Sequence, residues 1–358
     1  MTKWRSLFVI MALAIAPIAS CASPPESSAE GGEEGATATA AGSRLQTVLD
    51  RGELICGVEG NIPGFSFVNE SGEYSGIDVD FCRAVAAALF DDPEAVQYRN
   101  LDSTERFTAL SSGEVDMLAR NTTWTTSRDT SVGLEFAPTT FYDGQGMMVR
   151  ADAGIAGLED FGGKSICVET GTTTELNLTD QMSKLGVDFE PVVFQDANAA
   201  YAAYSEGRCE GMTSDKSQLI ARRSTLPDPD AHELLEVTMS KEPLGPVTIN
   251  NDSEWFDVVK WVTFSTIEAE ELGLEQGNVE EALNSSEDPN VLRFLGAEGD
   301  LGEGLGIEND FAYRVVQNVG NYGEIYNRNL GEDSQFGLSR DQNDLWTNGG
   351  LLYSPPFR

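Results

Sequence analysis

An alternation of strand and helix patterns that runs twice along the chain constrains the fold more than any other feature of the sequence. In the first run, residues 54–58 form a buried strand pattern, and a helix follows whose apolar face includes Phe81 and Leu89. The second run contains a strand pattern at 164–168 and a helix pattern at 197–204. Two such runs predict an α/β protein with two lobes, each carrying its ligand-binding loops at the carboxyl ends of its strands.

Two segments cross between the predicted lobes. Residues 141–149 leave the first run, and residues 247–250 return to it. Two crossing segments make a hinge about which the lobes can close. We therefore expect lobe 1 to contain residues 44–148 and 245–358, the latter with a C-terminal extension, and lobe 2 to contain residues 149–244.

The N-terminal sequence predicts export. Basic residues precede an apolar run at 7–18, which is too short to span a membrane and has the layout of a secretory signal. The next segment, Ile-Ala-Ser-Cys at 18–21, resembles a bacterial lipobox, in which the cysteine, here Cys21, carries a lipid. The alternative is an ordinary signal peptide with a chance cysteine. We expect a lipoprotein signal peptide at 1–21, a disordered tether at 22–43, and a folded body that is lipid-anchored outside the cytoplasm.

Composition narrows the classes of partner. The chain has 358 residues, 23 Lys and Arg against 59 Asp and Glu, and a net charge of −36. This charge excludes nucleic acid as a partner by simple repulsion. The apolar residues, 40% of the chain, are enough to form hydrophobic cores. We also expect the protein to be a monomer.

The cysteine count agrees with export. With Cys21 set aside, four cysteines remain, and an even number in an oxidising compartment is typical of disulfides. Three pairings are possible, and we favour Cys56 with Cys82 and Cys167 with Cys209 because each bridge then lies within one predicted lobe. A zinc site is the rival hypothesis, but the sequence has no Cys-x-x-Cys and a single histidine. We expect no metal and no cofactor.

Hydroxyls and the guanidinium of Arg128 gather in the loop at 119–129, which follows a strand pattern. Thr123 and Arg128 are close enough in sequence for a turn to aim an O–H donor and a planar cation at one carboxylate. An α-amino-acid site needs this arrangement. The alternative is a helix N-cap, for which Thr125, Thr126 and Ser127 are all suitable, with Arg128 paired to Asp129 at the surface.

The second run ends its strands in comparable polar groups. Residues 169–175 place glycine and hydroxyls at a helix start, where free N–H groups and the helix dipole favour an anion. Thr172 and Glu175 also fit a capping box, which is compatible with that role. Asp215 ends another strand, and it either caps the next helix or supplies the counter-charge for an ammonium.

The order of these segments resembles that of the type II periplasmic solute-binding proteins of bacterial family 3. More narrowly, it resembles the general L-amino-acid-binding components of ABC importers, in a lipoprotein form. The likeness spans residues 45–357, nearly the whole mature chain. The motifs that carry it are CGVEGNIPGFS at 56–66, GIDVDFCRAVA at 76–86, ARNTTWTTSRD at 119–129, ICVETGTTTE at 166–175 and KEPLGP at 241–246.

The resemblance implies a ligand grip from both lobes. Arg128 takes the ligand's α-carboxylate, with help from Thr123 and from the backbone at Thr172 and Thr173. The α-ammonium is held by Asp215. The ligand is then delivered to a membrane permease.

Further residues are implied around this grip. The carbonyl of Asn121 and the hydroxyl of Thr123 help to hold the ammonium. Phe65 or Phe67 lines the side-chain pocket, and Glu59 lies at its edge. The resemblance also agrees with the favoured disulfides, because three of these cysteines, Cys56, Cys82 and Cys167, lie in the matched segments.

Glu59 and Glu169 depart from the family, in which neutral polar residues are more usual at these places. If both point inward, they disfavour acidic ligands and tolerate cationic ones. The alternative is that one or both face solvent.

Two other functions compete with transport. The same fold hosts periplasmic enzymes that resemble cyclohexadienyl dehydratase, which requires Glu59 or Glu169 to be a proton donor in the cleft. The sequence assembles no nucleophile, base and orienting partner, so we favour a protein that is not an enzyme. A ligand-sensing receptor domain is the third class, but no later apolar run is long enough to span a membrane.

Overall fold

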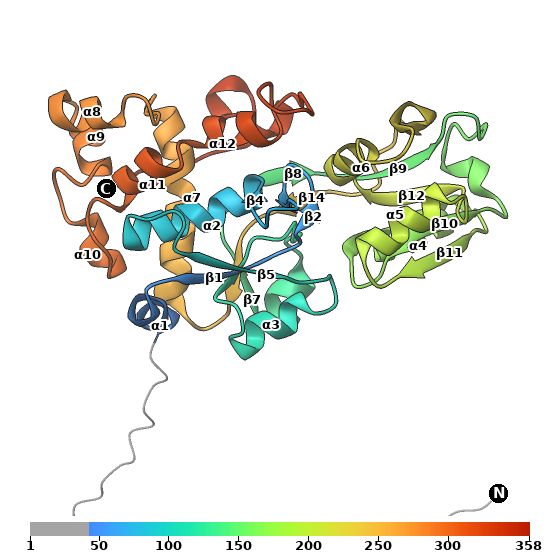
Figure 1. The fold of residues 1–358 in the computed structure, drawn as a ribbon, viewed down its shortest axis with the longest axis horizontal. Coiled ribbons are helices and arrows are strands. Elements are labelled where there is room, and N and C mark those ends of the chain that lie inside the picture. The colour runs from blue at the N-terminus through green and yellow to red at the C-terminus, as the bar shows by residue number, and fades with distance from the viewer. Residues whose placement is uncertain (1–42) are drawn as a thin grey trace, which may run out of the picture. The chain divides into compact units, whose positions relative to one another are not determined.

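The computed structural model describes residues 43–358 (Figure 1). The predictions for the signal peptide, for Cys21 and for nearly all of the tether lie outside the described residues. Ser43, the last residue of the predicted tether, is the N-cap of the first helix, where its hydroxyl accepts from the backbone N–H of Leu45. The same hydroxyl donates to Asp252 (3.2 Å).

A mixed five-stranded sheet forms the centre of lobe 1. Its strand order is β5-β1-β6-β15-β7, with the first three strands parallel and β15 antiparallel to both of its neighbours. The elements from the N-terminal side are α1 Arg44–Arg51, β1 Leu54–Val58, β2 Asn61–Ile62, β3 Ser66–Val68, β4 Tyr74–Ser75, α2 Ile77–Phe90, β5 Val96–Asn100, α3 Arg106–Ser112, β6 Met117–Leu118, a π-helical turn η1 Arg128–Val132 and β7 Leu134–Phe136.

Lobe 2 repeats the same arrangement with a second sheet, in the order β11-β10-β12-β9-β13. Its elements are β9 Gln145–Arg150, η2 Leu158–Phe161, β10 Ser165–Glu169, α4 Thr173–Leu185, β11 Glu190–Phe194, α5 Ala197–Ser205, β12 Gly211–Asp215, α6 Lys216–Arg223, η3 Pro229–Ala231 and β13 His232–Leu234. The predicted lobe boundary between residues 148 and 149 falls inside β9, which pairs over its whole length within this sheet.

Alternation along β9 shows how the second sheet is buried on both faces. Successive side chains of a strand point to opposite faces of a sheet. Met147 and Val149 pack in one apolar cluster, and Met148 packs in another. A strand with two covered faces reads as a continuous apolar run, which explains why this segment shows no polar alternation in the sequence.

Two short antiparallel strands connect the lobes. They are β8 Phe141–Asp143, on the way out, and β14 Glu242–Leu244, on the way back to β15 Val247–Ile249. Because both crossings are paired with each other, the connection is a two-stranded ribbon (Figure 1). A hinge of two segments is thus present, but its return strand is β14 at 242–244, whereas residues 247–249 of the predicted return segment form β15 within the sheet of lobe 1.

The C-terminal extension is helical and packs on lobe 1. Its elements are α7 Ser253–Glu271, α8 Val279–Ser285, α9 Pro289–Phe294, α10 Leu301–Leu305, α11 Phe311–Asn318, α12 Tyr322–Asn329 and two 3-10 turns, η4 Asp341–Asn343 and η5 Trp346–Asn348. Trp255 of α7 is fully buried, and its indole N–H donates to the carbonyl of Asp116 (2.8 Å). No helix within residues 43–358 is both long and apolar enough to cross a membrane.

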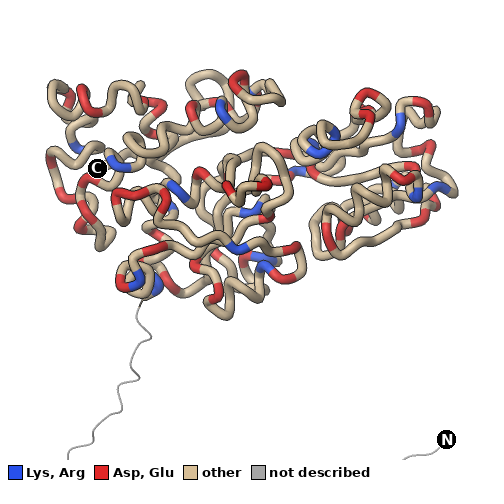
Figure 2. The backbone as a smooth tube through the Cα atoms, viewed as in Figure 1, with Lys and Arg blue, Asp and Glu red and all other residues tan. Residues whose placement is uncertain are grey.

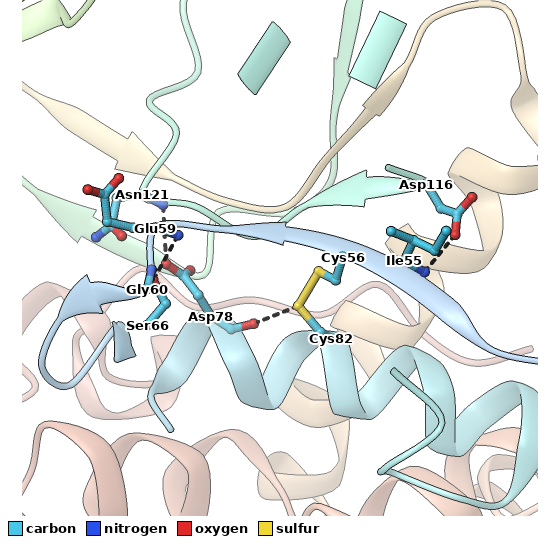
Figure 3. Close-up of a disulfide and its surroundings, with 9 residues drawn as sticks. All are labelled: Ile55, Cys56, Glu59, Gly60, Ser66, Asp78, Cys82, Asp116 and Asn121. Atoms are coloured by element: carbon cyan, nitrogen blue, oxygen red, sulfur yellow. Dashed lines mark hydrogen bonds between the residues drawn. A yellow bond between two sulfur atoms is a disulfide. The ribbon is translucent and has the colours of Figure 1, made fainter. Parts of the chain in front are cut away.

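Both favoured disulfides are formed. Cys56 of β1 is bonded to Cys82 of α2, and Cys167 of β10 is bonded to Cys209, just before β12. Figure 3 shows the first bridge joining the strand to the helix, about one turn along α2 from Asp78. Each bridge stays within one lobe, so neither restrains movement at the hinge.

Candidate ligand-binding site

One cavity lies between the lobes, at the carboxyl ends of the parallel strands of both sheets. Its free volume, counted as the space open to the centres of water molecules, is small, about 30 Å³. Fourteen of its fifteen lining residues are polar or charged, with Ile62 as the exception, so it suits a small polar ligand. The lining residues are Glu59, Ile62, Ser103, Arg106, Arg120, Asn121, Thr123, Arg128, Glu169, Thr172, Thr173, Thr174, Ser214, Asp215 and Gln218.

Arg128 reaches this cavity from the start of η1. Its side chain is buried, and Nη1 donates to the carbonyl of Thr123 (2.8 Å). Thr125 accepts a hydrogen bond from the backbone N–H of Arg128 (3.3 Å), so the predicted cap forms as well. The predicted surface pair with Asp129 does not form; Asp129 accepts instead from the indole of Trp124. Burial lowers the pKa of Arg128 to about 10, which leaves it cationic at neutral pH.

Asp215 faces the same cavity from lobe 2, at the end of β12. It occupies the N-cap position of α6 without making a side-chain cap bond, and its Oδ1 has no hydrogen-bond partner. Burial raises the pKa of Asp215 well above its ordinary value, and the nearby Asp143 and Glu242 raise it further. A buried carboxylate without a partner is costly, so the site favours a cationic ligand group here.

Asn121 lies in the loop after β6 with φ of 40°, a conformation that Asn tolerates better than most residues. Its backbone N–H donates to Asp78 Oδ2 (3.2 Å), which helps to hold this conformation, as Figure 3 shows. Both polar atoms of the Asn121 side chain are buried without a partner. They are therefore available to a ligand.

The first turn of α4 supplies backbone donors. Thr172 is the N-cap, and its hydroxyl accepts from the backbone N–H of Glu175 (3.1 Å), which is one half of the predicted capping box. The other half does not form, because the Glu175 carboxylate accepts from the backbone N–H of Gly171 (3.0 Å). The first amides of a helix lack partners within the helix, and the helix dipole adds positive potential there. Thr173 begins α4 and lines the cavity, so this turn presents an anion-binding edge.

Glu59 and Glu169 both point into the cavity, but they do not leave it negatively charged. Arg120 forms ion pairs with Glu59 and with Glu169 (Nη2 to Oε1, 3.7 Å). Ser103 also donates to Glu169 (2.6 Å). Burial raises the pKa of Glu59, an effect that the charge of Arg120 partly offsets. One cation thus lies between the two carboxylates and partly offsets the negative charge on which the expected discrimination against acidic ligands depends.

Arg106 is a second cation that the sequence reasoning missed. It is buried on α3 and donates to the carbonyl of Gly171 in lobe 2 (Nη2, 3.4 Å). Its guanidinium lies over the ring of Phe107 at 4.7 Å. Burial, with Arg120 and Arg128 nearby, lowers the pKa of Arg106. With these three arginines, the cavity lining carries as many cations as carboxylates.

The two predicted aromatic residues do not line the cavity. Phe65 is 1% exposed and packs edge-on against Phe141 of the hinge strand, with ring centroids 5.1 Å apart. Phe67 lies on β3 and is 37% exposed. The physical reason is that α12 covers this side of the hinge with Tyr326, so Phe65 is drawn into that apolar cluster.

Glu242 is another buried charge beside the site that was not predicted. It lies on the hinge strand β14 and is 1% exposed. Its Oε2 accepts from the hydroxyls of Thr123 (2.6 Å) and Thr173 (2.8 Å), which come from different lobes. The motif at 241–246 was a sequence signal for Glu242. For Ser103 and Arg120, the signal was their position shortly after predicted strands, where ligand-binding groups gather.

The chemistry of the site is recognition by charge and hydrogen bonding. Two lobes present cations, carboxylates, hydroxyls and helix-start amides to one small volume, where charged hydrogen bonds are strong. Within residues 43–358 no three or more potential metal ligands gather at one point. The eight predicted residues other than the two phenylalanines all line this cavity.

Comparison with known proteins places the chain in a family. The chain is 47% identical to the general L-amino acid-binding periplasmic protein AapJ of Rhizobium johnstonii, over 90% of this chain and 95% of that protein. It is 44% identical to the glutamate/glutamine/aspartate/asparagine-binding protein BztA of Rhodobacter capsulatus, over 89% and 94%.

A solved structure of a related protein has a similar fold. The chain matches a periplasmic binding protein of an ABC transporter from Brucella ovis, with glutathione bound, at a TM-score of 0.86 and 46% identity, covering 88% of this chain and all of that one. The predicted two-lobe fold is thereby confirmed. Residues 54–281 match the model of the bacterial extracellular solute-binding proteins, family 3, and the chain belongs to that family.

Proposed function

We propose that the protein binds the zwitterion of an L-amino acid between its lobes and delivers it to the permease of an ABC importer. The observation that carries this proposal is the placement of Arg128 and Asp215 on opposite lobes but on one shared cavity. A zwitterion offers one group of each sign, so a single ligand satisfies both lobes at once. The functions named for the relatives from Rhizobium and Rhodobacter support the same proposal.

The atoms of the site support a specific grip. Arg128 and the first amides of α4 take the α-carboxylate, because all of these groups are donors. Asp215 and the unpartnered side chain of Asn121 take the α-ammonium. The partners of each ligand group are thus contributed by both lobes, which makes closure and binding one event.

The opposite end of the cavity supports polar side chains, acidic ones included. Arg120 lies between Glu59 and Glu169, so a ligand carboxylate meets a compensated charge and not a bare negative one. The neighbouring Arg106 adds a further cation. We therefore propose glutamate, glutamine, aspartate and asparagine as the first ligands to test, with glutathione as a larger α-amino acid of the kind bound by the Brucella protein.

The proposal includes the location of the protein. We propose that Cys21 carries a lipid and that the folded body acts outside the cytoplasm as a monomer. Support comes from the lipobox pattern at 18–21 and from the extracellular character of the family.

Arg128→Ala is the substitution that tests the grip. Removing a buried, charged partner of a ligand costs roughly 2 to 5 kcal/mol, which corresponds to at least about a 30-fold loss of affinity. Titration calorimetry of the purified protein against the panel measures this loss. Arg150→Ala, which removes an exposed arginine paired with Asp152, is the matched control and leaves affinity unchanged.

Two results contradict the proposal. Affinity retained in Arg128→Ala overturns the assigned grip. Turnover of a bound amino acid, followed by mass spectrometry of the ligand, overturns transport in favour of the enzyme. Binding without any product over hours contradicts the enzyme hypothesis and supports a binding role.

A further inference from the structure

Glu242 lies where the hinge meets both half-sites. It is the first residue of β14, the strand that returns from lobe 2 to lobe 1. Its carboxylate is almost fully buried at 1% exposure, and it does not itself line the cavity. A buried carboxylate needs several donors to replace water. The identity of those donors indicates what Glu242 does.

Two of the donors are hydroxyls that line the ligand cavity. Oε2 of Glu242 accepts from Oγ1 of Thr123 at 2.6 Å and from Oγ1 of Thr173 at 2.8 Å. Thr123 belongs to the loop after β6 in lobe 1, whereas Thr173 begins α4 in lobe 2. One carboxylate oxygen therefore holds a hydroxyl from each lobe.

The second oxygen of Glu242 is occupied as well. Oε1 accepts from Nδ2 of Asn177 at 2.9 Å and from the hydroxyl of Ser240. Four donors on two oxygens match the acceptor capacity of an ionised carboxylate, which has no proton to give in return. The hydrogen-bond directions in this group are thereby fixed: every hydroxyl proton points toward Glu242.

This direction decides what the threonines offer to a ligand. A hydroxyl has one proton and two lone pairs. Since the proton of Thr123 is committed to Glu242, the side of its oxygen that faces the cavity is an acceptor. An acceptor repels a ligand carboxylate and attracts an ammonium. The Thr123 and Thr173 oxygens lie only 3.4 Å apart, so both contribute to the same acceptor surface.

We propose that Glu242 is a positioning residue that turns the hydroxyls of Thr123 and Thr173 into acceptors and so directs the ligand's ammonium to this side of the cavity. The proposal rests on the proposed amino-acid function. It assigns Thr123 to the ammonium alone, and it leaves the carboxylate to Arg128 and the amides of α4. Because the two hydroxyls come from different lobes, the acceptor surface is complete only when the lobes meet.

Glu242→Gln tests this proposal without changing the volume of the side chain. An amide has one acceptor oxygen and one donor nitrogen, so at least one threonine must turn its proton toward the cavity. The probes are L-glutamine, or the tightest amino acid of the panel above, and the counterpart that lacks only the α-amino group. Calorimetry should show a loss of about tenfold or more for the amino acid, as for a charged hydrogen bond. The des-amino counterpart should change less than about threefold.

Control variants separate positioning from a purely structural role. Ser240→Ala removes a donor to Oε1 that does not line the cavity, and it should leave the ratio of the two affinities unchanged. In a Thr123→Val background, Glu242→Gln should add less than about twofold, because the hydroxyl it acts through is gone. Thr123→Ser keeps the hydroxyl and should restore the full effect of Glu242→Gln.

The outcomes are distinct. Equal losses for the amino acid and its des-amino counterpart overturn the positioning role, as does an undiminished effect in the Thr123→Val background. If Glu242→Gln does not fold, as judged by its thermal unfolding, Thr123→Val alone carries the test and must favour the des-amino counterpart in the same way. Failure of the unmodified protein to bind any amino acid overturns the proposed function instead.

Discussion

The charge state of Asp215 largely determines the electrostatics of the site. Its buried carboxylate has an oxygen without a partner, and burial together with Asp143 and Glu242 raises its pKa well above the ordinary range. Arg128 is the largest opposing influence on that pKa. When a ligand carboxylate binds to Arg128, the guanidinium stabilises the ionised form of Asp215 less. The ligand's own ammonium must then supply that stabilisation.

This replacement predicts proton release on binding. An ammonium beside Asp215 lowers its pKa, so the pKa of the free protein lies above that of the complex. At pH values between the two, binding releases up to about one proton, and affinity rises with pH through that window. Calorimetry in buffers of different ionisation enthalpy counts the protons. Asp215→Asn should abolish the release; an equal release in that variant would assign the proton to another group.

Residues that end predicted strands were within reach of the sequence. Arg128, Asp215 and Glu169 follow strands in both lobes, and the rule that loops meet at the carboxyl ends of parallel strands brings them together. Their binding roles stay predictions. Phe65 was misplaced because the ring that it packs on, Phe141, is distant in sequence and is itself stacked on Tyr326 of the extension.

At the scale of elements, most of the fold was predictable from apolar periodicity. β1 Leu54–Val58 was predicted with its observed bounds, and α5 Ala197–Ser205 was predicted with its observed start and to within one residue at its end. By contrast, β6 Met117–Leu118 has only two residues, which pair with two residues of β1 and with one of β15. The pairing of β8 with β14 joins segments about a hundred residues apart, which no local pattern encodes.

The extension also supports the hinge strand β8. Asn343 of η4 accepts from the backbone N–H of Tyr142 (2.6 Å) and donates to its carbonyl (3.1 Å), as a neighbouring strand would. Tyr322 of α12 donates to the carbonyl of Thr140 (2.8 Å). The extension therefore completes one edge of the hinge ribbon.

Asn343→Ala tests this support. Two hydrogen bonds to the backbone are lost at a site that is 5% exposed, so unfolding in urea should show a stability decrease of roughly 1 to 3 kcal/mol. Gln342→Ala, an exposed neighbour in the same turn, is the control and should stay within about 0.5 kcal/mol. A decrease no larger than that of the control would mean that β8 does not depend on the extension.

The whole molecule combines an acidic surface with a balanced site. Figure 2 shows Asp and Glu distributed along both lobes, in keeping with the net charge of −36. Inside the cavity, three arginines face three carboxylates. The overall charge therefore bears on solubility and on partners of the surface, whereas ligand choice depends on the local balance.

Closure of the two lobes is supported by contacts outside the cavity as well as within it. Arg222 of α6 in lobe 2 donates from Nη1 to the carbonyl of Asn61 in lobe 1 (2.8 Å). Its other Nη donates to Asn198 (2.8 Å) within lobe 2, and its guanidinium lies 4.8 Å from the centre of the Tyr201 ring. Arg222 does not line the cavity. Its contact with Asn61 therefore acts on binding through the equilibrium between open and closed lobes, while its charge also opposes the rise in the pKa of Glu59, which lines the cavity.

Arg222→Ala should therefore weaken amino-acid binding without touching the ligand. A partly exposed charged hydrogen bond that exists only in the closed state contributes about 1 kcal/mol, so affinity should fall roughly fivefold. Stopped-flow measurements should place most of the change in the dissociation rate, because the contact forms after the ligand has entered. Asn198→Ala removes only the partner within lobe 2 and should leave affinity nearly unchanged. If Arg222→Ala binds as tightly as the unmodified protein, this contact does not hold the ligand-bound lobes together.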